Sequence, residues 1–263
     1  MQLGGVHAIV TGGSSGIGLE TARRLGDRGA RVSLVARDRT RLAAAQRETG
    51  AIATASIDVT DPDAVANGFA RLTAAHGPCD LLVTSAGAAE PGYFERLDAQ
   101  VFRDQMDLDY FGTLHCVRAV VPAMLEQGGG TIVGISSTAG LIGVFGFTAY
   151  APAKYAVRGL MDALRAELAP RGIRVSCVYP PDTDTPGLAR ENLTKPPETV
   201  AVSGSIKAVP PEKVAAAIVR GIERDRADIT CDPRTALVLR GGGLLAPVIG
   251  RMMARQVRRV ANP

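Results

Sequence analysis

The sequence has few of the residues that build metal centres or disulfide frameworks. It contains four cysteines and three histidines in 263 residues, all widely scattered, and no C-x-x-C pair. Zinc sites need closely spaced ligands and disulfide scaffolds need many cysteines, so we expect no metal site and reduced cysteines. Reduced cysteines are expected of a cytoplasmic protein, and the lone histidines His7, His76 and His115 are expected to be structural rather than catalytic.

A strong excess of charge is also lacking. The net charge is +4 at pH 7, and only 21% of the residues are charged. Because no basic patch is interleaved with aromatic residues, a nucleic-acid partner is excluded.

Long hydrophobic runs are absent as well. The first apolar run, residues 6–10, has the length of a strand and no basic stretch before it, so no signal peptide is expected. An uncharged run near the C-terminus, residues 241–250, is about half the length that a membrane-spanning helix needs. The sequence therefore predicts no membrane-spanning segment.

The chain does contain a regular alternation of strand-like and helix-like segments. This alternation predicts an α/β fold with a doubly wound parallel sheet, three αβα layers and one domain. We expect strands at 6–10, 31–36, 51–56, 80–84, 130–136, 173–178 and 227–231, and helices at 62–75, 97–127, 150–170 and 212–224, the second broken near Pro122. The catalytic domain is predicted to cover 1–235, with a polar substrate loop or lid within 180–210, and the tail to cover 236–263.

A glycine-rich loop, T-G-G-S-S-G-I-G, follows the first predicted strand and precedes a helical pattern. In this context Gly12 permits a tight turn, Gly16 lets the backbone approach a pyrophosphate, and Gly18 allows close packing of helix on strand. The N–H groups at the helix N-terminus would bind the phosphates. The alternative is an ordinary glycine-rich turn. The predicted dinucleotide-binding residues of this loop are Gly12, Ser14, Ser15, Gly16, Ile17 and Gly18.

Arg37 stands at the end of the second strand, where NAD enzymes of this architecture place an acidic residue. A guanidinium there suits a 2′-phosphate, so the sequence predicts NADPH as the cofactor. The neighbouring Asp38 weakens this preference, and Ser14 could donate to the same phosphate. The alternative is a solvated arginine.

Tyr150 and Lys154 lie four residues apart at the start of a predicted helix, so their side chains share one face. An ammonium beside a phenol favours the phenolate, which would lower the tyrosine pKa from about 10 toward working pH. Such a tyrosine can exchange a proton with a substrate oxygen, and Ser137 on the preceding loop could hold that oxygen. The alternative is a surface pair on an amphipathic helix, since Y-x-x-x-K alone is a weak motif. The pair gains weight because the chain has only four lysines.

Together, the glycine loop, Ala86-Gly87, Ser137, Tyr150 and Lys154 resemble the short-chain dehydrogenase/reductase family over roughly residues 6–187. The resemblance implies a Rossmann fold and a nicotinamide cofactor. It makes Ser137 the residue that orients the substrate oxygen, Tyr150 the acid, and Lys154 the residue that lowers the tyrosine pKa and binds the nicotinamide ribose. The cofactor-binding residues expected outside the glycine loop are Arg37, Asp58, Val59, Ala86, Gly87, Tyr150, Lys154, Pro180 and Thr183.

The long helix departs from the family pattern at Asp109, in M-D-L-D-Y-F-G-T. The family usually has asparagine there, holding a water that links the lysine to solvent. An aspartate could still accept from that water, but its charge would pair with Lys154 and alter the tyrosine pKa. We include Asp109 among the catalytic residues. The departure at Asp109 also suggests an alternative function, a cofactor-sensing protein whose catalytic site has decayed. The intact Ser137, Tyr150 and Lys154 argue against this alternative.

Three longer stretches, residues 145–150, 178–187 and 190–199, resemble a subgroup of that family, the 3-ketodihydrosphingosine reductases. Pro181, where the wider family usually has glycine, is shared with this subgroup. The resemblance implies NADPH-dependent reduction of the C3 ketone of 3-ketosphinganine in sphingolipid synthesis. The alternative substrate is another apolar ketone, such as a 3-oxoacyl thioester or a steroid.

Asp182 and Asp184 follow the sixth strand, at the sheet edge where the nicotinamide is expected. The implied substrate carries an amine beside its ketone, and an unpaired buried cation is costly. One of these aspartates could therefore face the ammonium. The alternative is that both carboxylates cap backbone N–H groups in the turns of P-P-D-T-D-T-P.

The C-terminal tail mixes apolar residues with arginines. The tail could lie peripherally at a membrane surface, or it could pack against the domain or a subunit partner. We also expect a homo-oligomer, either a dimer or a tetramer. The residues that would contact the membrane are Leu244, Leu245, Val248, Ile249 and Met252 in the interface, and Arg251, Arg255, Arg258 and Arg259 near the head groups.

Overall fold

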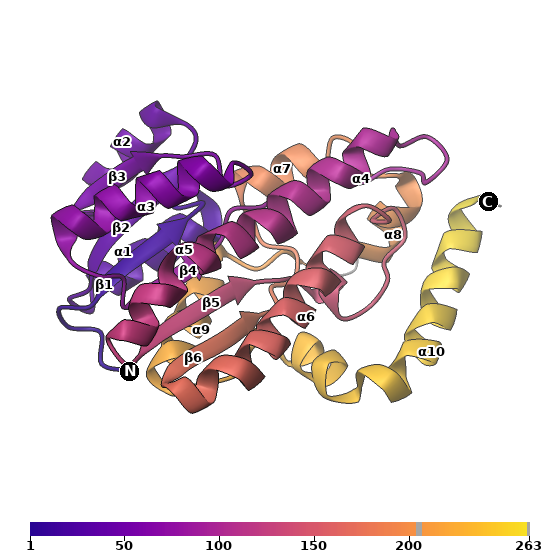
Figure 1. Ribbon diagram of the computed structural model, residues 1–263. Helices are drawn as coiled ribbons and strands as arrows, with labels where there is room; N and C mark the ends of the chain where they lie inside the picture. Colours follow the sequence, from indigo (N-terminus) through magenta and orange to yellow (C-terminus); the bar gives the residue numbers. More distant parts are fainter. Residues whose placement is uncertain (204–206, 262–263) are drawn as a thin grey trace.

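Seven parallel strands form one sheet in the order β3-β2-β1-β4-β5-β6-β7 (Figure 1). The computed structural model describes residues 1–203 and 207–261. The chain starts at β1 in the middle of the sheet, runs outward to β3, returns to β4, and then runs outward to β7, so the predicted doubly wound sheet is confirmed. The strands are β1 His7–Thr11, β2 Arg31–Ala36, β3 Ala53–Ser56, β4 Leu81–Thr84, β5 Gly130–Ile135, β6 Ile173–Val178 and β7 Asp228–Ile229.

Helices cover both faces of the sheet because the strands are apolar on both sides. In β1, Ala8 and Val10 pack into the cluster beneath α1, α2 and α9, whereas Ile9 packs into the cluster beneath α3, α5 and α6. The two clusters are the two cores of a three-layer αβα fold. The covering helices are α1 Gly16–Gly26, α2 Arg39–Thr49, α3 Pro62–His76, α5 Gly112–Glu126, α6 Tyr150–Leu168 and α9 Pro211–Glu223.

The long helical region after β4 is irregular at a different place from the one predicted. It consists of α4 (Ala99–Gln105), a π-helical turn (Met106–Phe111) and α5. The predicted break near Pro122 is wrong, because Pro122 lies inside α5 on its exposed side, where water can satisfy the freed carbonyl. The π-helical turn carries Asp109, which is completely buried, and such turns are frequent at functional sites.

The segment after β6 is more ordered than the predicted loop. It contains two short helices, α7 (Pro186–Glu191) and α8 (Pro197–Ser203), each beginning with a proline at its first position. Thr185 caps α7 by accepting a hydrogen bond from Leu188 N at 3.2 Å. Its polar composition predicted a loop, but the prolines and the cap start helices. Residues 204–206, which belong to the predicted lid, lie outside the described residues.

The last helix, α10 (Pro233–Ala261), begins just before the predicted start of the tail. Its first turn is fixed to the core by Thr235, which is buried and lies 3.2 Å from the Thr138 hydroxyl. Farther along, α10 packs against α8 and runs up one side of the molecule (Figure 1). None of the helices described over 1–203 and 207–261 has the length and hydropathy needed to cross a membrane.

Candidate active site

The glycine loop after β1 leaves no room for side chains. Gly12 has a left-handed φ of 64°, and a Cβ on it would lie 2.5 Å from the carbonyl oxygen of Ser85 at the end of β4. A Cβ on Gly18 would collide with the carbonyl of Gly12. Because β1 and β4 are the strands between which the winding reverses, the loop lies at the sheet position where such folds bind dinucleotides.

The start of α1 fits a phosphate group. Ser15 is the N-cap but its side chain makes no capping hydrogen bond, and the first turn contains no acidic residue. The first N–H groups of α1 can therefore donate to an anion, helped by the positive end of the helix dipole. Thr185, from the segment after β6, lies over this turn, since a Cβ on Gly16 would be 2.9 Å from its methyl group. Thr185 is not among the site residues predicted from the sequence.

The Arg37 side chain is exposed and can turn toward a phosphate. Its exposed fraction is 70%, and its guanidinium is 3.6 Å from Asp58, which also accepts hydrogen bonds from Thr60. Asp38 does not compete for that phosphate site, because its carboxylate caps α2 by accepting from Arg41 N at 3.0 Å. These residues fit the 2′-phosphate of NADPH.

The Arg37→Ala variant is expected to raise the KM for NADPH by one to two decades and to leave the KM for NADH unchanged. Losing one charge-assisted contact to a phosphate costs about 1.5–3 kcal/mol. Initial-rate kinetics with both cofactors provide the test, with Arg47→Ala, at an exposed position of the nearby helix α2, as control. An unchanged NADPH KM would assign the phosphate to another residue.

The catalytic candidates come together where the C-terminal end of β5 meets the N-terminal turns of α6. Ser137 lies two residues after the end of β5, and its hydroxyl interacts with the phenol of Tyr150, the first residue of α6. Lys154 lies one turn later, with its Nζ 5.5 Å from the centre of the Tyr150 ring and 3.2 Å from the Ile135 carbonyl, to which it donates. The structure thus brings together Ser137, Tyr150 and Lys154.

Asp109 forms a buried ion pair with Lys154. Its Oδ1 is 3.1 Å from Lys154 Nζ, and the two side chains are 0% and 6% exposed. Burial raises the pKa of the Asp109 carboxyl, against the attraction of Lys154. Burial alone would lower the pKa of Lys154, but Asp109 and the Tyr150 phenol together raise it, so the lysine is a stable cation. Gly87 permits this arrangement, because a Cβ on it would lie 2.5 Å from Asp109 Oδ1.

The Tyr150 pKa differs from the prediction. Burial raises the pKa of Tyr150 to about 12, although Lys154 and the hydrogen bond from Ser137 both lower it, while the Asp109 carboxylate raises it further. Lys154 acts in the expected direction, but the expected net fall below 10 is wrong for the chain alone, because desolvation of the phenolate outweighs one cation that is already paired. At neutral pH the phenol is protonated and can donate.

The remaining predicted cofactor residues lie at the same edge of the sheet. Asp58 and Val59 follow β3, Ala86 and Gly87 follow β4, and Pro180 and Thr183 follow β6. The Ala86 amide donates to Thr11 Oγ1 at 3.3 Å, and the Pro180 carbonyl accepts from Thr138 N at 3.0 Å, which fixes these loops to one another.

The segment after β6, the predicted lid, contains a charged cluster, and only one of its members, Asp182, was predicted from the sequence. Lys195, whose side chain is 4% exposed, lies 2.8 Å from Glu191 and 3.4 Å from Asp182. Its Nζ is also 5.8 Å from the ring centre of Phe147, whose ring packs 5.7 Å from that of Tyr150. Two carboxylates and one ammonium leave the cluster one positive charge short. Asp184, the other predicted partner of the substrate amine, is exposed.

Comparisons with known proteins agree with this geometry. The family model for the short chain dehydrogenase matches residues 6–196. A 3-ketodihydrosphingosine reductase of Dictyostelium discoideum is 43% identical over 258 residues, covering 90% of this chain and 77% of that protein. Its counterpart in Mus musculus is 42% identical over 229 residues, covering 84% and 69%.

Solved structures show the same architecture. An actinorhodin polyketide ketoreductase crystallised with NADPH superposes with a TM-score of 0.78 at 31% identity, covering 86% of this chain and 95% of that one. A short-chain dehydrogenase from Streptomyces avermitilis superposes with a TM-score of 0.80 at 29% identity, covering 98% and 100%.

Proposed function

We propose that this chain, which belongs to the short-chain dehydrogenase family, is an NADPH-dependent reductase of the 3-keto group of 3-ketodihydrosphingosine. The observation that carries the substrate is the identity of 43% to a 3-ketodihydrosphingosine reductase over 90% of the chain. The site is consistent with it, because a serine, a protonated tyrosine and a buried lysine meet beside the dinucleotide position.

In this proposal NADPH supplies the hydride, and the residues of the chain handle the oxygen and the proton. Ser137 donates a hydrogen bond that holds the ketone oxygen against Tyr150. As negative charge develops on that oxygen, the Tyr150 phenol donates its proton. Lys154 stabilises the phenolate left behind, and Asp109 keeps Lys154 in place and charged.

The direct test is NADPH consumption with 3-ketosphinganine, with the product identified by mass spectrometry. The proposal predicts dihydrosphingosine in amounts equal to the NADPH consumed. If the protein binds NADPH but forms no dihydrosphingosine, the substrate assignment fails. The alternative of another apolar ketone, such as a 3-oxoacyl thioester or a steroid, would then be examined with the same assay.

We further propose that the lid cluster recognises the amine of the substrate. Glu191 and Asp182 share only Lys195, so the ammonium beside the ketone would supply the missing positive charge. Burial raises the pKa of Glu191 while Lys195 lowers it, as expected for a carboxylate short of cations. Among residues 1–203 and 207–261, neither the Asp182 nor the Asp184 carboxylate accepts a hydrogen bond from a backbone N–H group, so a purely capping role lacks support.

The Asp182→Asn variant should therefore lose activity on 3-ketosphinganine by about 1.5–3 kcal/mol, the worth of a charged hydrogen bond, and keep activity on the analogue without the amine. Values of kcat/KM for both substrates provide the test, with the exposed Asp184→Asn as the matched control. Equal losses on the two substrates would assign Asp182 to lid structure alone.

The outer side of α10 supports a peripheral contact with an anionic membrane. The helix contains six arginines and no acidic residue. Arg251, Arg255 and Arg259 are exposed at intervals of one helical turn, and Met252 beside them is 60% exposed. The side chains of Leu244, Leu245 and Val248, which were expected to enter the interface, lie outside the described residues.

Replacing Arg251, Arg255 and Arg259 by alanine should reduce co-sedimentation with anionic liposomes by about 1 kcal/mol for each arginine. Neutral liposomes serve as the control, since they should retain little of either protein. Equal binding of both proteins to anionic liposomes would rule out this face.

The expected homo-oligomer stays a prediction, which light scattering at several concentrations can check.

A further inference from the structure

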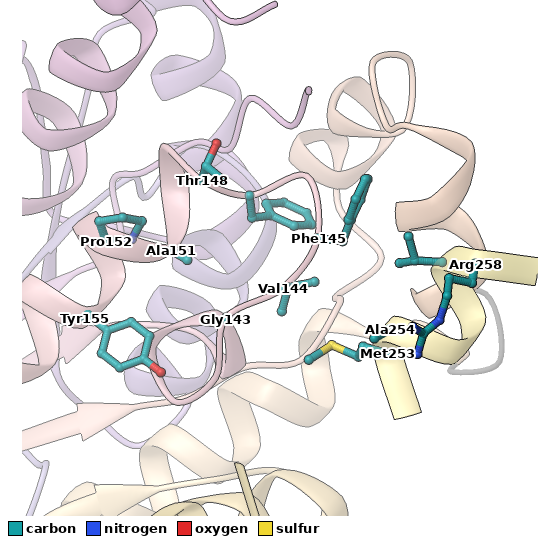
Figure 2. Close-up of a pocket in the computed structure, with 12 residues that line it drawn as sticks. Gly143, Val144, Phe145, Thr148, Ala151, Pro152, Tyr155, Met253, Ala254 and Arg258 are labelled. Carbon is teal, nitrogen blue, oxygen red and sulfur yellow. The ribbon is translucent and has the colours of Figure 1, made fainter. Parts of the chain in front are cut away.

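An apolar groove separates the loop before α6 from the C-terminal half of α10 (Figure 2). Its volume is about 840 Å³, which is within the range of volumes of small-molecule sites, and the groove is open to solvent along one side. The apolar side chains that line it are chiefly Val144, Phe145, Phe147, Ala151, Met253 and Val257.

The groove begins one side chain away from the catalytic phenol. Phe147 and Ala151 line the groove and also belong to the apolar cluster against which Tyr150 packs. The rings of Phe147 and Tyr150 are 5.7 Å apart. Phe147 is therefore the apolar side chain that lies between the groove and the catalytic phenol.

Charge separates the groove from the lid cluster. None of the described residues that line the groove is acidic, and its one charged group is the exposed Arg258 on α10. The Asp182 and Glu191 carboxylates do not line the groove. They pair with Lys195, whose Nζ is 5.8 Å from the centre of the Phe147 ring. An amino ketone with a long hydrocarbon chain matches this division, with its cation at the carboxylates and its chain in the groove.

We propose that this groove binds the hydrocarbon chain of the ketone substrate, with α10 as its outer wall. The inference rests on the proposed function and adds the part of the site that distinguishes substrates by the length of their hydrocarbon chain. Filling the groove removes apolar side chains of the protein and the methylenes of the ligand from water together. The flexible side chain of Met253 in the wall can adapt to such a chain.

The test compares 3-ketosphinganine with a short-chain analogue of the same amino-ketone head group. In the wild type kcat/KM should rise with chain length, by up to roughly fourfold for each buried methylene. Ala254 lines the groove from α10 and is exposed, so Ala254→Trp should fill the groove without disturbing the core. This variant should lose at least about tenfold in kcat/KM on the long substrate, through KM, and nothing on the short one.

The matched control is Leu237→Trp, at a 62% exposed position of the same helix that does not line the groove. It should change neither substrate. Equal effects of Ala254→Trp on both chain lengths, or no effect on either, would overturn the proposal.

A second measurement separates this inference from the proposed function. If the wild type reduces amino ketones of neither length, the proposed substrate is wrong, and binding of an NBD-labelled long-chain alkylamine then tests the groove. Weaker binding by Ala254→Trp than by the wild type and Leu237→Trp would support the groove as an alkyl site. Equal binding by all three proteins would overturn it.

Discussion

Replacing Tyr150 by phenylalanine is expected to abolish nearly all turnover while NADPH binding is retained. The change removes one oxygen atom and almost no volume, so the packing of the ring against Phe147 should persist. A positioned general acid contributes about 10²–10⁴-fold to the rate, and the loss of kcat should be of that size. Because the pKa of Tyr150 is raised to about 12, the wild-type phenol is protonated across the neutral range and available as the acid.

Single-turnover kinetics and cofactor titration measure the two halves of this prediction separately. Tyr110→Phe removes the same atom from a tyrosine that packs against Phe111 and serves as the control. A variant that keeps substantial turnover would show that water or another group supplies the proton. A variant that no longer binds NADPH would show a structural role for the phenol.

Replacing Lys154 by methionine should damage stability as well as activity. The Asp109 carboxylate would remain buried without its cation, which costs about 3–5 kcal/mol for a broken buried pair. Turnover should fall because the phenolate loses its nearby positive charge, and cofactor binding should weaken if Lys154 also holds the ribose. Urea unfolding gives the stability, and kinetics with NADPH give the other two quantities.

The double variant Lys154→Met with Asp109→Asn tells these effects apart. Removing both charges should restore much of the stability, because a neutral pair of similar volume carries no uncompensated charge. Activity should stay low, since the lysine is still missing. If the double variant is as unstable as the single one, the ion pair is not the cause of the loss.

The single variant Asp109→Asn should shift the pH dependence without destroying the fold. The Asp109 carboxylate raises the pKa of Tyr150, so its removal lowers that pKa. Reduction needs the protonated phenol and fails as the pH rises through its pKa, so the alkaline limb of kcat should move to lower pH. An unshifted limb would place Asp109 outside the proton path.

The sheet and its cofactor edge could be predicted because their determinants are local. Apolar β-branched runs, the glycine loop and the Tyr150–Lys154 spacing each specify a short segment, and the parallel winding brings the segment ends to one edge. The close contact between Gly12 and Ser85 follows from that topology. The NADPH cofactor follows from the same motifs and agrees with the family to which the chain belongs.

The features that escaped prediction depend on contacts distant in the sequence. The pKa of Tyr150 depends on how completely its neighbours, among them Phe147 and Ala139, remove the phenol from water, and the Y-x-x-x-K spacing carries no information on this. Lys195 pairs with Asp182 and Glu191 only because α7 forms where a polar composition predicted a loop. The groove exists only because α10 turns back beside residues 143–148, more than one hundred residues earlier.

The most direct test of the central assignment is a comparison of kcat/KM for 3-ketosphinganine, a 3-oxoacyl thioester and a ketosteroid, with NADPH held constant and each product identified by mass. Dihydrosphingosine formation with the highest kcat/KM of the three is the predicted result. Reduction of the thioester or the steroid, with 3-ketosphinganine left unreacted, would contradict it and assign the chain to a different ketone.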